Sequence, residues 1–261
     1  YSLNSLTSGD SNVAVGYLAL EDLTSGTVNV AIGQQAGADL TTTGATHNVI
    51  VGTQALYRAT TGAGYNVAIG SYAMGGNFTT ANVDSCVAIG YEALNGTLTT
   101  DATGTVAVGQ RAAKAITSGV GNTAVGFQAL LVENDGDHNT AVGYKALTTQ
   151  NSSDGAGQNT AIGYEAGKLV TTGIHNTLIG NEAGDALTIA TRNVAIGSRA
   201  LSSEDVGDRS IAIGFSALSQ QNSDSNNETA GNIGIGVEAG FYNVTGTGNT
   251  FLGYQAGFGS S

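Results

Sequence analysis

Apolar residues recur along the chain as short runs of three, each followed by a glycine, and not as the stripe of an amphipathic helix. The first run is VAV at 13–15, before Gly16, and it returns as VAI before Gly33 and as TAI before Gly163. With each of these glycines numbered as position 0, position −1 is always Val, Ile or Leu and position +3 is always Ala. A phrase of constant length that returns at short intervals predicts a repetitive fold.

The phrase occurs fourteen times, with gaps of 17 to 22 residues between successive glycines. All variation in length falls between position +4 of one copy and position −4 of the next, which is typical of coils joined by surface loops. The fourteen glycines are Gly16, Gly33, Gly52, Gly70, Gly90, Gly109, Gly126, Gly143, Gly163, Gly180, Gly197, Gly214, Gly236 and Gly253.

Each phrase predicts a β-strand of about five residues that ends at its glycine, because the phrase is short and β-branched. Positions −3, −2 and −1 are mostly apolar in succession, so both faces of the strand must be covered, as in a parallel sheet. We expect positions +1 to +6 to form a return strand. Position +2 is expected to face solvent, because it is charged at Glu92, Lys145 and Glu165.

The predicted fold is therefore all-β, a parallel β-roll or solenoid of about 14 coils with 17–22 residues each. The pattern predicts that residues 1–261 form a single repetitive segment. It begins with a partial repeat at 1–11, continues with full repeats over about 12–257, and reads as truncated at both ends.

Position −1 is predicted to fill the interior of each coil, together with Ala166 at position +3. The predicted core residues at position −1 are Val15, Ile32, Val51, Ile69, Ile89, Val108, Val125, Val142, Ile162, Ile179, Ile196, Ile213, Ile235 and Leu252.

Position −4 is Asn in eleven copies and predicts a turn, because a short amide bonds to nearby backbone and tolerates left-handed φ. Stacked coils would align these amides in a ladder. The ladder residues are Asn12, Asn29, Asn48, Asn66, Asn122, Asn139, Asn159, Asn176, Asn193, Asn232 and Asn249, and the departures are Cys86, Thr105 and Ser210.

The outer face of the sheet is expected to carry small residues, because position −2 is Ala in ten copies and position 0 is always Gly. Such a face lets another backbone approach closely. A two-stranded roll has an interior too thin to shield both faces of its first strand. We therefore predict a homotrimer, with the chains intertwined or side by side along a fibre.

The composition of the chain excludes several classes of function. The net charge is −12 with only 8 Lys and Arg, so the chain lacks the basic footprint that nucleic acid requires. No apolar run approaches the ~20 residues of a membrane span, so no membrane insertion is expected. One cysteine, Cys86, cannot form an intrachain disulfide. Its place at position −4 marks it as a substituted turn residue.

Residues with catalytic or metal-binding chemistry are few. His47, His138 and His175 all lie at position −5 and are interpreted as turn variants. Asp135 and Asp137 flank a glycine in the loop ENDGDHN, as in some Ca²⁺ loops, and are the one metal candidate. The loop occurs once and lacks the twelfth-position Glu, which favours a solvated connector. No enzyme activity and no cofactor are expected.

The repeat resembles two related groups. The forms HNTAVGYKALTT and QNTAIGYEAGKLVTTG resemble shaft repeats of bacteriophage tail fibres. The shorter phrase N-V/T-A-V/I-G is similar to the head repeats of trimeric autotransporter adhesins, which are left-handed parallel β-rolls in trimers. The resemblance runs from Asn12 to Gly257. Two features favour the phage fibre, namely the longer coil and the frequent aromatic residue at position +1. These aromatic residues are Tyr17, Tyr91, Phe127, Tyr144, Tyr164, Phe215 and Tyr254.

The resemblance implies a structural segment of a virion tail fibre, a rigid spacer that also serves host attachment. Its implied partners are two further copies of the chain and a host-surface receptor, glycan or protein. Host contacts would come from the variable connectors 148–158 and 219–231. The alternative is the head of a trimeric adhesin on a bacterial surface. A third hypothesis is a capsule-degrading fibre, with carboxylates such as Glu165 and Glu182 cleaving polysaccharide between chains.

Overall fold

The chain folds as an all-β parallel solenoid of about 13 turns, which confirms the predicted fold class. The computed structural model describes residues 1–41, 44–59, 62–78, 83–98, 103–153, 155–223 and 229–259, and these contain strands and turns but no helix. Two compact units are present, Tyr1–Gln128 and Ala129–Ser261, called unit 1 and unit 2 below. The same coil builds both.

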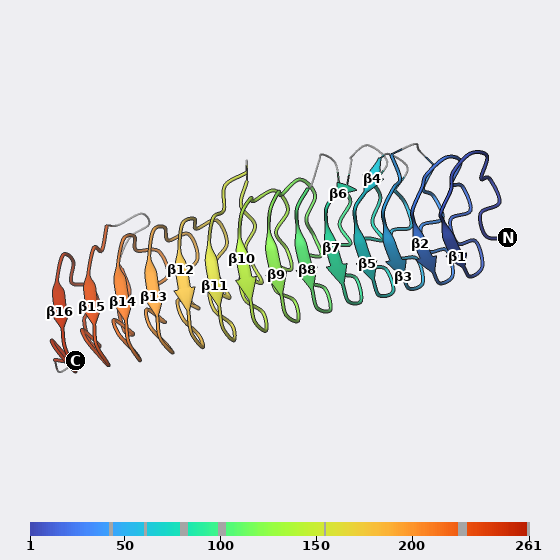
Figure 1. Cartoon of the computed structure of the whole chain (residues 1–261). Helices are drawn as coiled ribbons and strands as arrows, with labels where there is room; N and C mark the ends of the chain where they lie inside the picture. Colours follow the sequence, from blue (N-terminus) through green and yellow to red (C-terminus); the bar gives the residue numbers. More distant parts are fainter. Residues whose placement is uncertain are drawn as a thin grey trace. The chain divides into compact units, whose positions relative to one another are not determined.

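Unit 1 contains one three-residue strand per coil, and neighbouring strands pair in parallel in chain order (Figure 1). These strands are β1 (Val13–Val15), β2 (Val30–Ile32), β3 (Val49–Val51), β5 (Val67–Ile69), β7 (Val87–Ile89), β8 (Val106–Val108) and β9 (Thr123–Val125). Two short strands, β4 (Ala63–Gly64) and β6 (Val83–Asp84), form a separate parallel pair.

Unit 2 repeats the arrangement with β10 (Thr140–Val142), β11 (Thr160–Ile162), β12 (Thr177–Ile179), β13 (Val194–Ile196), β14 (Ile211–Ile213), β15 (Ile233–Ile235) and β16 (Thr250–Leu252). The pairing is in register, so that Ile162 lies beside Ile179 and Ala161 beside Leu178. Equal positions of successive coils therefore stack into columns along each unit.

The predicted return strand is wrong, because positions +1 to +6 form consecutive turns. Positions +2 and +4 have left-handed φ, as at Glu165 (52°) and Leu147 (49°). The N–H at position +3 donates to the carbonyl at position 0, for example Ala183 to Gly180 at 3.4 Å, which closes a turn. The turns still bond from coil to coil, since Glu165 N donates to Tyr144 O at 2.9 Å.

Position −2, and not position −1, points into the interior. Ala161 and Ala195 are fully buried, whereas Ile162 and Ile235 are exposed. Successive side chains of a strand point to opposite faces, so positions −3 and −1 share the outer face. The prediction is therefore corrected for Val15, Ile32, Val51, Ile69, Ile89, Val108, Val125, Val142, Ile162, Ile179, Ile196, Ile213, Ile235 and Leu252, none of which is buried in the single chain.

The interior is filled mainly by positions −2, +3 and +4, with apolar residues at position +7 such as Leu23 and Leu187, and the sizes at positions −2 and +4 compensate. Where position −2 is large, as at Leu178, the neighbouring +4 residues are Gly167 and Gly184. A Cβ on either glycine would lie 2.6 or 2.7 Å from a Leu178 methyl. Ile50 fits beside Gly37 in the same way. The narrow core is thus packed by exchange of volume between adjacent coils.

The small residues interpreted as a face for a neighbouring chain serve the single chain instead. Gly180 at position 0 has φ of +138°, and its missing Cβ would lie 2.6 Å from the carbonyl carbon of Gly197 in the next coil. The backbone that approaches these glycines belongs to the next coil of the same chain. The Ala column at position −2 likewise faces the interior.

Replacing Ala166 by leucine is expected to destabilise unit 2 by about 1 to 3 kcal/mol, because overpacking a filled core forces strain. Ala166 is fully buried at position +3. The control is Glu165→Leu, since Leu18 occupies the same coil position with a similar φ of 58°. That change removes an ion pair with Lys168, which is worth about 0 to 1 kcal/mol. Chemical denaturation of both variants measures the difference, and equal losses would contradict the inward orientation of position +3.

Candidate binding surfaces

The outer face of the sheet carries two columns of aliphatic and threonine side chains, at positions −3 and −1. In unit 2, position −3 contributes Thr, Val or Ile, and position −1 contributes Val, Ile or Leu. Val15 is 56% exposed and Ile162 39% exposed. Contiguous apolar surface of this kind is uncommon on monomeric proteins and marks interaction sites. We call these two columns the outer sheet face.

The asparagine ladder lies at the corner where each strand begins, and its residues are buried except Asn12 and Asn249. Asn176 N and Nδ2 donate to Asn159 Oδ1 at 2.8 and 3.1 Å, while Asn159 Nδ2 donates to Gly173 O at 2.8 Å. The Asn159 amide therefore bonds twice to the turn that begins the next coil, through its oxygen to Asn176 and through its nitrogen to Gly173. Cys86 and Ser210 keep part of the ladder, because their N–H groups donate to the preceding Asn66 and Asn193 side chains.

Replacing Asn159 by alanine is expected to cost about 2 to 4 kcal/mol, because the buried Asn176 N–H and Gly173 C=O both lose their side-chain partner. The matched control is Asn151→Ala, which makes the same chemical change at an exposed position. Urea denaturation followed by circular dichroism measures both. An Asn159→Ala loss no larger than that of the control would show that the ladder contributes little to stability.

An aromatic row and a polar row follow the strand. The aromatic side chains at position +1 are exposed, and Tyr144 and Tyr164 stack with centroids 5.3 Å apart. Side chains at position +2 bond between coils, as in the Arg199–Glu182 ion pair at 2.9 Å. Glu165 is only 14% exposed and bonds Lys168, so position +2 is less solvated than predicted.

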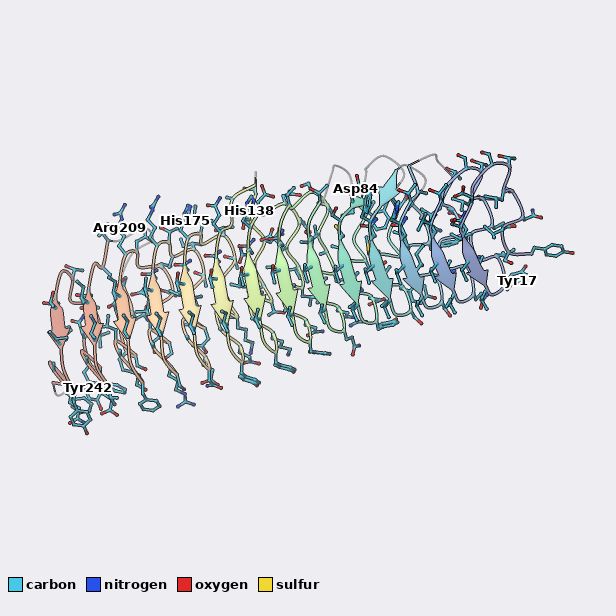
Figure 2. The ribbon with its side chains drawn as sticks, viewed as in Figure 1. Tyr17, Asp84, His138, His175, Arg209 and Tyr242 are labelled. Atoms are coloured by element: carbon cyan, nitrogen blue, oxygen red, sulfur yellow. The ribbon has the colours of Figure 1, made fainter. Side chains whose placement is uncertain are left out.

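The three histidines occupy the turn before the ladder, as their common position suggested. His47, His138 and His175 have φ of 59°, 56° and 61°. Figure 2 shows His138, His175 and Arg209 along one edge of unit 2. His47 stacks on Tyr65 at 4.9 Å in unit 1. Their side chains are surface groups on a repeated turn.

Two buried carboxylates hold the bases of the long connectors. Glu133 accepts hydrogen bonds from Gly136 N at 2.9 Å and from Ser152 N and Oγ at 3.2 Å. Glu204 likewise accepts hydrogen bonds from Gly207 N at 2.7 Å and from Ser223 Oγ at 2.9 Å. Burial raises the pKa of Glu133 above its usual value.

These connectors were expected to supply the host contacts, at 148–158 and 219–231. Their bases are buried and fixed, since Gln150 and Gln221 are enclosed beside the two carboxylates. Residues 154 and 224–228 lie outside the described part of the chain. The sequence signal for this arrangement is position +7, which is Glu or Gln in these coils and is Leu at Leu23, Leu40 and Leu187.

The metal candidate and the paired carboxylates are not assembled into a site by the described residues. Within that part of the chain no group of three or more His, Cys, Asp or Glu could hold a metal, so Asp135 and Asp137 gain no third acidic ligand there. Glu165 and Glu182 are each engaged in an ion pair, with Lys168 and Arg199 respectively.

Cys86 is fully buried, and burial raises the pKa of its thiol to about 11. A thiol in this state is a poor nucleophile at neutral pH, because the thiolate is the reactive form.

None of the described segments forms a helix of the length and hydrophobicity needed to cross a membrane. Comparison of the chain with protein-family models, curated proteins and solved structures found no match.

Proposed function

We propose that this chain is a structural segment of a bacteriophage tail fibre, assembled as a homotrimer, that serves as a rigid spacer and contributes to host attachment. The observation that carries the proposal is the outer sheet face. It presents β-branched side chains to water on strand after strand, and burial of that surface would stabilise an assembly.

Identical chains are the occupants that fit this face best. All strands run in one direction and their columns repeat with the coil, so a second copy in the same orientation matches every row. The face has two columns, at positions −3 and −1. In a closed ring of three, each chain would pack one column against each neighbour, whereas a single partner would have to cover both.

The spacer role is supported by the continuity of bonding along each unit. Strand backbones, turn backbones and buried asparagine amides all bond from one coil to the next. A solenoid bonded at every corner resists bending and local opening. The host-attachment role is supported by the long connectors, which rise from fixed bases.

An antibody against the purified segment tests the biological role by immunogold electron microscopy of an induced culture of the source bacterium. Label on virion tails supports the fibre. Label confined to the cell envelope would overturn it in favour of the adhesin head, which the outer sheet face also fits. Release of reducing ends from capsule polysaccharide would instead favour the degrading fibre.

A further inference from the structure

A groove on unit 2 lies apart from the outer sheet face and from the connectors. It has a volume of about 420 Å³ and is lined mainly by position +2 and position +5 residues of four successive coils. The +2 side is formed by Glu182, Arg199 and Glu238, and the +5 side by Ser202 and Phe241 among others. We call it the unit 2 groove.

Two aromatic rings give the groove apolar platforms. Phe215, at position +1, is 49% exposed on its lining. Phe241 is held from behind by Tyr242 and Phe258, with ring centroids 4.7 and 5.6 Å away. Figure 2 shows Tyr242 at the edge of unit 2 opposite the one that carries His138 and Arg209. Phe241 is therefore packed against neighbouring rings, and Phe215 presents its ring to solvent.

Polar groups between the rings are already oriented by the protein. Arg199 Nε bonds Glu182 Oε2 at 2.9 Å, and the Ser202 and Ser219 hydroxyls lie 3.0 Å apart. Glu238 Oε2 accepts from Gln255 Nε2 at 2.8 Å. These groups keep further lone pairs and N–H donors for a ligand, because each makes only part of its hydrogen bonds within the protein.

Asp185 supplies an unsatisfied acceptor on the same lining. Its Oδ1 is buried and has no hydrogen-bond partner among the described residues. Desolvation raises the pKa of this carboxyl to about 6, so it is mostly ionised at neutral pH. A buried acceptor without a donor is costly, and a ligand hydroxyl near the carboxyl would reduce that cost.

From this arrangement we infer that the unit 2 groove binds a neutral oligosaccharide. Aromatic faces pack against the C–H face of a sugar ring, and the row of carboxylates, hydroxyls and guanidinium bonds sugar hydroxyls in both directions. Three carboxylates against one guanidinium disfavour an anionic sugar. The lining uses the same coil positions of four successive coils, which suits an extended chain better than a compact molecule. This inference rests on the proposed host-attachment role and assigns its ligand class.

A glycan array probed with the full segment tests the inference, with chitohexaose and maltohexaose as neutral probes and hexagalacturonate as the anionic one. We expect at least one neutral hexasaccharide to bind. Phe215→Ala should weaken that binding about tenfold, as expected for loss of one aromatic contact. The control is Tyr164→Ala, at the same coil position, with 48% exposure and outside the groove lining. It should bind like the unchanged chain.

Absence of binding to every neutral oligosaccharide on the array would overturn the inference, as would stronger binding of hexagalacturonate. An equal loss for Phe215→Ala and Tyr164→Ala would place the contact elsewhere and overturn it too. Thermal melts of both variants confirm that they remain folded. Virion-tail labelling without glycan binding would remove this inference and leave the proposed fibre role standing.

Discussion

Gly163→Ala is expected to destabilise unit 2 by about 3 kcal/mol or more, although it adds a single methyl group. Gly163 has φ of +145°, a backbone conformation that is almost confined to glycine and costs other residues roughly 1 to 3 kcal/mol. The added Cβ would also lie inside contact distance of the Gly180 carbonyl in the next coil. Backbone cannot move aside as a flexible side chain can, so the two penalties add.

The control is Gly253→Ala, at the same coil position near the end of the chain. Gly253 has φ of +118°, but nothing lies within 4 Å of the position its Cβ would take. This variant should therefore suffer the backbone strain alone. Chemical denaturation of both proteins separates the two effects. Equal destabilisation would show that the close approach of successive glycines is not a constraint.

The coil and its period could be predicted from the sequence, because both follow from a phrase of fixed length. Val, Ile and Ala next to an invariant glycine predict a strand, and the Asn position predicts the turn that begins it. The orientation of the strand could not be predicted from hydrophobicity alone, since positions −3, −2 and −1 are all apolar. The larger residue at position −1 was expected in the interior, whereas the structure places position −2 there, which is alanine in most coils.

The coils with a large residue at position −2 carry a sequence signal for the correct orientation of the strand. Large residues at position −2, such as Ile50 and Leu178, occur beside coils that carry glycine at position +4. Such compensation is expected only between residues that share an interior. The prediction of a return strand was wrong for a different reason. Leu at position +4 and Glu at position +2 give no indication of the left-handed φ that they adopt.

The candidate sites were the least predictable part. The unit 2 groove joins residues from four coils, so no local motif marks it. Glu133 and Glu204 look like ordinary surface acids in their loops, yet both are fully buried. Only comparison of position +7 across coils, where Leu23 and Leu187 are core residues, would have indicated that these carboxylates replace a buried leucine.

Ile162→Asp is expected to abolish assembly and leave the coil of the single chain folded. Ile162 lies on the outer sheet face, where an aspartate is solvated in one chain but would become an unpaired buried charge between chains. The adjacent Ala161→Asp places the charge in the interior, so it should prevent folding of the surrounding coils. Thr172→Asp, at an exposed position away from the sheet, should affect neither property.

The mass of the purified segment in solution, measured by light scattering, tests the central claim that the outer sheet face is buried between copies of the chain. We expect about three times the 26.0 kDa of one chain for the unchanged protein and for Thr172→Asp, and a single folded chain for Ile162→Asp. A folded 26.0 kDa monomer of the unchanged protein would contradict the claim. So would a trimer of Ile162→Asp with undiminished stability.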